Sequence, residues 1–151
     1  MPRLTTYNVR FDERRVGVLV KEGAINYNDS TVVDCPEKVV KILTDVFDAK
    51  NLAQEHFWMI ALDGGRKIIG LFVVSIGTLT ESLVHPREVF QRALLAGAAS
   101  IIIAHNHPSG ATDVSESDRD VSRRIRQAGE LLGIRLDDHI IVADGEYVSA
   151  M

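Results

Sequence analysis

The sequence predicts an α/β fold in which a mixed β-sheet carries helices on both faces. Runs of β-branched and aromatic residues, which are typical of strands, alternate with three segments that have helical apolar periodicity. The run "SIIIA" at 100–104 is almost wholly apolar, as expected of a central strand covered on both faces. The length of 151 residues suits one domain with a substantial core.

The N-terminal part, residues 1–35, is predicted to be an extension of strands packed on a domain formed by residues 36–151. Within the extension, "YNVRFDERRVGVLV" at 7–20 has the composition of one or two strands. Pro36 begins the first helix, because proline suits the first turn of a helix. A helix over 36–47 places its apolar residues on one stripe, namely Val39, Ile42, Leu43 and Val46.

A β-hairpin is predicted next along the chain. The segment 55–63, "EHFWMIALD", reads as a strand in which Phe57 and Trp58 belong to the core. The two glycines at 64–65 form a tight turn, and "KIIGLFVVSIG" at 67–77 returns as the second strand.

The C-terminal half alternates helices with strands. A helix over 86–99 has Pro86 in its first turn, and another helix over 115–132 ends at Gly133. The other elements, in chain order, are the strand 100–104, a loop at 105–114, and two closing strands at 134–144 and 147–150 that are joined by an Asp-Gly turn.

Composition and charge narrow the class of protein. Hydrophobic residues make up 46% of the chain and charged residues 25%, which is ordinary for a globular protein. A net charge of −4 argues against nucleic-acid binding through overall charge. The single cysteine, Cys35, allows no internal disulfide and fits a reducing compartment. With no signal-like N-terminus and no apolar run of bilayer length, we expect a cytoplasmic protein that does not contact membranes.

The stretch "IIIAHNHPSG" places two histidines at the end of the central strand. Side chains alternate along a strand, so His105 and His107 project to the same side if the extended conformation persists. The carboxyl end of a central strand is where α/β sheets tend to hold ligands, and two neutral imidazoles there can bind a divalent metal. Alternatively, such a pair bonds to the backbone or caps a turn.

A third ligand is expected from the helix that follows. Its apolar stripe runs through Val121, Ile125, Ala128 and Leu132. Extended backward by three residues, this stripe reaches Asp118. A carboxylate on the buried face of a helix needs a compensating charge, which a metal supplies. Ser115 precedes the helix and either caps its N-terminus or directs its hydroxyl at the site.

Two histidines and one aspartate leave the fourth tetrahedral position to water, which is typical of catalytic zinc. Zinc lowers the pKa of bound water and polarises a carbonyl oxygen. Hydrolysis also needs a general base close to that water, usually a carboxylate. Spacing leaves Glu55, Glu81 and Glu88 as candidates, because all three lie near the ends of expected strands or helices.

The sequence "HNHPSG", followed by Ser-x-x-Asp, resembles the JAMM motif of the JAB/MPN metalloprotease superfamily. The segments "QEHFW", "VSIGTL", "LVHPREVFQRAL" and "LLGIRLDDHIIVADGEYVS" extend this resemblance to the RadC-like branch over roughly residues 36–150. It implies a three-layer α/β/α sandwich, the JAB/MPN fold, similar to that of cytidine deaminases. It also implies a zinc-dependent peptidase with one zinc ion per chain. In the loop, "ATDV" at 111–114 departs from the "DPxP" that is usual in the family.

The resemblance also assigns roles to individual residues. It makes His105, His107 and Asp118 the zinc ligands. It makes Ser115 the group that stabilises the oxyanion, and Glu55 the general acid/base. A peptide or protein is the implied substrate, cleaved at a peptide or isopeptide bond.

Other polar residues have simpler interpretations. His56, His85 and His139 are expected to support their neighbours through packing or hydrogen bonds. Four arginines lie along the predicted helix 115–132, at Arg119, Arg123, Arg124 and Arg126. We expect them to form a solvated outer face, with a docking patch for an acidic partner or nucleic acid as the alternative.

Two other functions compete with a metallopeptidase. The first is a non-catalytic interaction domain that keeps the fold. Silent members of the superfamily typically lose metal ligands, whereas this sequence retains all the expected ligands and the glutamate, which argues for a catalytic protein. A DNA-repair-associated module is suggested by the RadC name. The acidic balance argues against it, and so does the lack, in these 151 residues, of the helix-hairpin-helix segment of full-length relatives. A zinc deaminase is excluded, because its paired cysteines cannot come from one cysteine.

Overall fold

The computed structural model describes residues 2–77 and 84–151, which form a seven-stranded sheet and three helices. The strands are β1 (Arg3–Phe11), β2 (Gly17–Asn26), β3 (Glu55–Leu62), β4 (Ile68–Gly77), β5 (Ser100–Asn106), β6 (Arg135–Ala143) and β7 (Glu146–Ser149). The helices are α1 (Pro36–Phe47), α2 (Pro86–Ala96) and α3 (Glu116–Leu132).

The strands follow the order β2-β1-β4-β3-β5-β6-β7 across the sheet. The pairs β1–β4 and β5–β6 are parallel, and the other neighbouring strands are antiparallel. The sheet is therefore mixed, as the sequence predicts. The hairpin of β3 and β4 is also confirmed. This order places β5 between β3 and β6. Residues of β3 and β6, which are far apart in the chain, therefore both lie next to the ends of β5.

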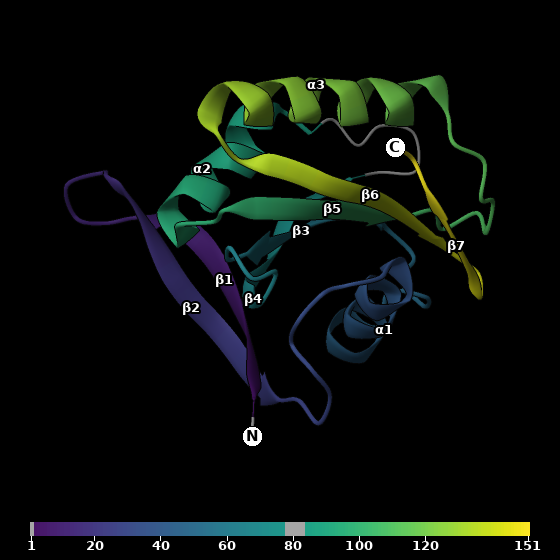
Figure 1. The fold of residues 1–151 in the computed structure, drawn as a ribbon, viewed down its shortest axis with the longest axis horizontal. Coiled ribbons are helices and arrows are strands. Elements are labelled where there is room, and N and C mark those ends of the chain that lie inside the picture. The colour runs from purple at the N-terminus through teal and green to yellow at the C-terminus, as the bar shows by residue number, and fades with distance from the viewer. Residues whose placement is uncertain (1, 78–83) are drawn as a thin grey trace.

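Helices cover both faces of this sheet, α1 on one side and α2 with α3 on the other (Figure 1). Alternation along the strands divides the core accordingly. Trp58 and Ile60 of β3 pack with α1 in one apolar cluster, whereas Phe57 and Met59 pack with α2 and α3 in the other. The three-layer α/β/α architecture is thereby confirmed, and Phe57 and Trp58 are buried.

Residues 3–26 form two strands of the sheet and the turn between them. Strands β1 and β2 pair along their whole length, and β1 pairs in parallel with β4. The strand content expected at 7–20 is present, but it extends over Arg3–Phe11 and Gly17–Asn26. The domain boundary that the sequence places between residues 35 and 36 stays a prediction.

Two elements have different ends from those the sequence predicts. Helix α2 ends at Ala96 rather than at residue 99, because Gly97 adopts a left-handed conformation with φ 70° and closes the helix. Strand β5 continues through Asn106 instead of ending at residue 104. His105 is therefore a strand residue and has a fixed orientation.

The buried stripe of α3 is rotated from the predicted one. Ile125 is buried as expected, but Ser122 and Gly129 join it, whereas Leu132 is 46% exposed. The reason lies at Gly129, where a Cβ atom would stand 2.2 Å from the carbonyl oxygen of Ile134. Absence of a side chain lets the chain fold back tightly over the helix as it enters β6, and Leu132 then points outward.

Candidate metal centre

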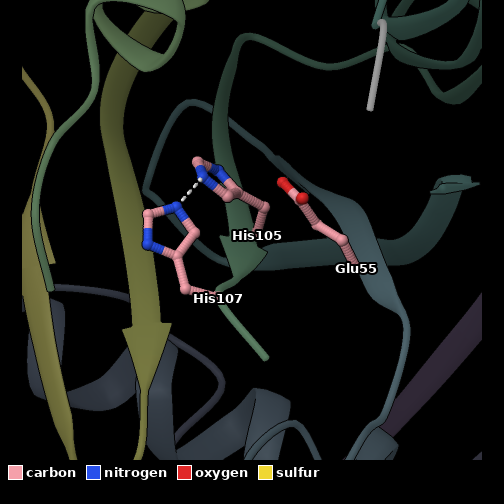
Figure 2. Close-up of side chains that lie close together, drawn as sticks. All are labelled: Glu55, His105 and His107. Atoms are coloured by element: carbon pink, nitrogen blue, oxygen red, sulfur yellow. Dashed lines mark hydrogen bonds between the residues drawn. The ribbon is translucent and has the colours of Figure 1, made fainter. Parts of the chain in front are cut away.

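His105 and His107 meet at the end of β5, as their spacing predicts. His105 lies opposite Phe57 of β3, and the main-chain N–H of His107 donates to the carbonyl of Val142 in β6. These neighbours hold both ends of the His-x-His segment. The two Nε2 atoms lie 3.0 Å apart and the rings face a common space (Figure 2).

Asp118 completes this cluster from the first turn of α3. Its Oδ1 lies 3.1 Å from Nε2 of His105, and its Oδ2 lies 3.4 Å from Nε2 of His107. The same carboxylate accepts the N–H of Ser115 at 3.0 Å, while the Ser115 hydroxyl accepts the N–H of Asp118. This capping box fixes the direction of the carboxylate. Ser115 is thus the N-cap of α3, and its predicted role toward an oxyanion stays a prediction.

Burial and hydrogen bonding act in opposite directions on the Asp118 carboxyl. Burial raises its pKa, but the contacts with the imidazoles of His105 and His107 and the hydrogen bond from the backbone of Ser115 outweigh burial and lower the pKa well below the usual range. Asp118 is therefore anionic at neutral pH. A negative charge therefore lies beside the two imidazoles.

His107 is oriented by a contact outside the cluster. Its Nδ1 lies 2.9 Å from the carbonyl oxygen of Ala111, an acceptor that requires a hydrogen on Nδ1. The hydrogen bond with Asp118 raises the pKa of His107, partly opposed by burial. In the neutral ring, the lone pair is on Nε2, which faces His105 and Asp118.

Glu55, the first residue of β3, approaches the two histidines from the neighbouring strand. One oxygen of its carboxylate and one ring nitrogen of each histidine all lie within 4.8 Å of one another. The carboxylate points toward His105 (Figure 2). The position fits a group that exchanges a proton with water at the cluster.

Asn106 holds Glu55 in this position, and sequence reasoning did not identify it. Its side-chain Oδ1 accepts the N–H of His56 at 2.6 Å, and its Nδ2 donates to the carbonyl of Gln54 at 3.0 Å. The two bonds fix the backbone on either side of Glu55, beyond the point where β3 and β5 pair. The signal in the sequence was the asparagine between the two histidines of "HNH", directly after an apolar strand. An amide at such a position is buried and must find hydrogen-bond partners.

His139 of β6 lies behind His105 and is fully buried. Its Nε2 lies 2.9 Å from Nδ1 of His105, and its Nδ1 contacts the hydroxyl of Ser122. Burial, reinforced by the nearby His105, lowers the pKa of His139 to about 3. The ring is therefore neutral, with one nitrogen that donates a hydrogen bond and one that accepts. The supporting role expected for this histidine is confirmed in the form of two polar contacts.

The remaining candidates are also placed by the structure. Glu88 lies in the first turn of α2, outside the group that Glu55 forms with the histidines in the described residues, and Glu81 lies outside the described residues. His56 bonds to the carbonyl of Gln54 and stacks on Trp58, and His85 caps α2. The four arginines of α3, Arg119, Arg123, Arg124 and Arg126, are exposed as expected.

The donor atoms fit a zinc ion. Ligand atoms that share a tetrahedral zinc lie about 3.3 Å apart, because zinc–nitrogen and zinc–oxygen bonds are about 2.0–2.1 Å long. The separations of 3.0, 3.1 and 3.4 Å among His105, His107 and Asp118 are close to that value. Two imidazole nitrogens and a carboxylate are also a donor set that suits zinc. The assignment of these three residues as ligands stays a prediction that this geometry supports.

A three-layer sandwich with a His-x-His strand end and a helix aspartate facing it defines an α/β/α domain of the JAB/MPN type. The chain belongs to the RadC-like JAB domain family, whose model matches residues 33–151. The resemblance drawn from the motifs is thereby confirmed.

Relatives with curated sequences carry the name UPF0758 protein. The one from Geobacillus thermodenitrificans (strain NG80-2) is 44% identical over 123 residues, which are 82% of this chain and 54% of the relative. That from Pelobacter propionicus is 46% identical over 103 residues, 68% of this chain and 45% of the relative. That from Geotalea uraniireducens is 48% identical over 96 residues, 64% of this chain and 42% of the relative. The chain thus spans about half the length of these relatives, and their names state no activity.

Within residues 2–77 and 84–151, no helix is both long enough and apolar enough to cross a membrane.

Proposed function

We propose that the chain is a zinc-dependent metallopeptidase of the JAMM type, which hydrolyses a peptide or isopeptide bond. One observation carries the proposal: the ring nitrogens of His105 and His107 converge with the carboxylate of Asp118, and Glu55 stands beside them. Three ligands and an adjacent carboxylate are what metal-assisted hydrolysis requires. A peptide or protein substrate and a cytoplasmic location are part of the proposal.

Each residue of the cluster has a defined task in this reaction. His105, His107 and Asp118 would hold one zinc ion per chain, and Ala111 and Ser115 would keep two of these ligands in place. When bound, zinc would supply a water of lowered pKa and a positive charge next to the substrate carbonyl.

Glu55 would act as the general base and then as the general acid. Its carboxylate accepts a proton from the water whose oxygen attacks the carbonyl carbon. It then delivers that proton to the amine nitrogen as the C–N bond breaks. The Ser115 hydroxyl accepts a hydrogen bond from Asp118 but retains its own hydrogen. Through that hydrogen it would donate a hydrogen bond to the substrate carbonyl oxygen as negative charge develops there.

The competing function is a non-catalytic or DNA-repair-associated interaction module. The exposed arginines of α3 motivate it, although Arg123 is paired with Asp120 on the same helix. An interaction module does not require an anionic carboxylate beside two imidazoles, or a second carboxylate within reach of them. The arrangement of the cluster therefore favours the hydrolase.

Elemental analysis of the purified, zinc-equilibrated chain is the first test. We expect about one zinc ion per chain in the wild type and none in the double variant His105→Ala, His107→Ala. Full zinc occupancy in the double variant would show that the ligands are misassigned.

Cleavage of a peptide library is the second test. Glu55→Gln should keep zinc and the fold but lose about 10²- to 10⁴-fold in rate, because the amide cannot accept the proton. Glu88→Gln is the matched control and should keep its activity. A zinc-loaded wild type that cleaves no peptide and no isopeptide, but binds DNA through the arginines of α3 in a salt-sensitive manner, would establish the interaction module instead.

A further inference from the structure

A chain of buried hydrogen bonds leads from the candidate metal ligand His105 to the C-terminal segment. Nδ1 of His105 lies 2.9 Å from Nε2 of His139. Nδ1 of His139 contacts Oγ of Ser122 in α3, and Oγ of Ser122 lies 3.2 Å from the carbonyl oxygen of Ala150. The residues His105, His139 and Ser122 are 2%, 0% and 7% exposed, so their polar atoms must be matched within the protein.

The carbonyl at the end of the chain decides the direction of all the bonds. The oxygen of Ala150 can only accept, so Ser122 donates its one hydrogen there. Oγ of Ser122 must then accept a hydrogen from Nδ1 of His139. With its hydrogen on Nδ1, the neutral ring of His139 has its lone pair on Nε2, which accepts the hydrogen on Nδ1 of His105. Nε2 of His105 is left with a lone pair that faces Asp118.

The position of Ala150 is itself fixed. Its main-chain N–H donates to the carbonyl of His139 at 2.8 Å, immediately beyond the pairing of β6 with β7, where Ile140 lies opposite Ser149. The pairing of β6 with β7 therefore fixes the carbonyl oxygen of Ala150, and this acceptor determines the tautomers of His139 and His105. The opposite direction would leave Ala150 without the Ser122 hydrogen and place a hydrogen on Nε2 of His105, where a metal would have to bind.

We propose that Ser122 and His139 are positioning residues that fix His105 in the Nδ1–H tautomer and present its Nε2 lone pair to the metal. The proposal rests on the proposed function in that His105 is a metal ligand. A ligating histidine usually donates its second N–H to a partner, and loss of that partner typically weakens metal binding by about 10- to 100-fold. Here the partner is another histidine, which needs its own tautomer fixed, and Ser122 fixes it.

Two-bond ¹H–¹⁵N correlation spectra of the histidine rings test the direction of the chain without a metal. In the metal-free wild type, His139 should be the Nδ1–H tautomer. Ser122→Ala removes the acceptor for that hydrogen and should increase the Nε2–H population of His139. Ser117→Ala, on the exposed side of the same helix, is the control and should leave the tautomer unchanged. A wild-type His139 in the Nε2–H form overturns the proposal.

Zinc competition with a chromophoric chelator tests the consequence for metal binding. His139→Leu removes the acceptor for His105 and should bind zinc about 10- to 100-fold more weakly. His139→Gln offers an amide oxygen near the position of Nε2 and should recover most of the affinity. A folded His139→Leu variant with wild-type affinity overturns the positioning role. If that variant does not fold, Ser122→Ala decides, since wild-type affinity and an unchanged tautomer would also contradict the proposal.

The two proposals fail in different ways. A wild type that binds no zinc refutes the proposed function and with it the role of His139 in metal binding, whereas the metal-free spectra still decide the direction of the hydrogen bonds. A wild type that binds zinc while His139 carries its hydrogen on Nε2 refutes the positioning chain alone.

Discussion

Acidification should destabilise the metal-free protein through His139. The ring is fully buried, and its pKa is about 3 in the folded chain against 6.5 for an ordinary histidine. Below pH 6.5 the unfolded chain therefore binds a proton at this residue that the folded chain does not. Stability rises with pH wherever the unfolded state binds more protons. Above pH 6.5 burial of the neutral ring costs no stability through protonation. The free energy of unfolding then decreases progressively as the pH falls from 6.5 towards 3.

The size of the effect follows from linkage. Between about pH 7.5 and about pH 5, the unfolded chain takes up nearly one proton at this residue, and the integrated loss of unfolding free energy is about 2 kcal/mol. The folded ring remains neutral throughout this range, so the unfolded state alone sets the loss. His107 acts in the opposite sense, because its raised pKa stabilises the folded chain as the pH falls below that pKa. A comparison with a variant that retains His107 isolates the part due to His139.

Urea unfolding in the presence of a chelator measures this loss. Wild type should lose about 2 kcal/mol more than His139→Gln when the buffer is changed from about pH 7.5 to about pH 5. His85→Asn is the control, because it leaves the buried ring in place and should retain the wild-type loss. Equal losses in the wild type and His139→Gln would refute the reasoning that burial keeps this imidazole neutral.

Three further predictions concern single residues and the metal. Asn106→Ala should lower the unfolding free energy by about 1–3 kcal/mol and speed amide exchange at His56, because that N–H loses its buried acceptor. Exchange at the wild-type rate there would contradict the role of Asn106 in holding the backbone beside Glu55. Gly129→Ala should destabilise by about 1–3 kcal/mol despite better helix propensity, since the Cβ would meet the Ile134 carbonyl; a raised Tm would contradict this. Removal of zinc by a chelator should lower the Tm of the wild type, and less so that of Asp118→Asn; equal shifts would argue against Asp118 as a ligand.

Local rules account for much of the fold. Proline at 36 and 86 begins α1 and α2, and Gly133 ends α3, as predicted. These features depend on residues close together in the chain, whose conformational preferences act wherever the segment is placed. The observed end of α2 differs from the predicted one because Gly97, in the left-handed conformation, closes the helix before the apolar run is complete.

From the sequence by itself it followed that His105 and His107 share one face wherever the strand stays extended, and that Ser115 precedes a helix whose first turn carries Asp118. Both are matters of spacing within a few residues. Spacing left Glu55, Glu81 and Glu88 open, and only the family resemblance pointed to Glu55. The tertiary structure brings Glu55 to the histidines, because β3 lies beside β5 in the sheet. It also decided the contacts of Asn106 and His139, which span 50 and 34 residues. Such contacts depend on strand order and register, which are set by the packing of the whole sheet, so spacing along the chain carries no record of them.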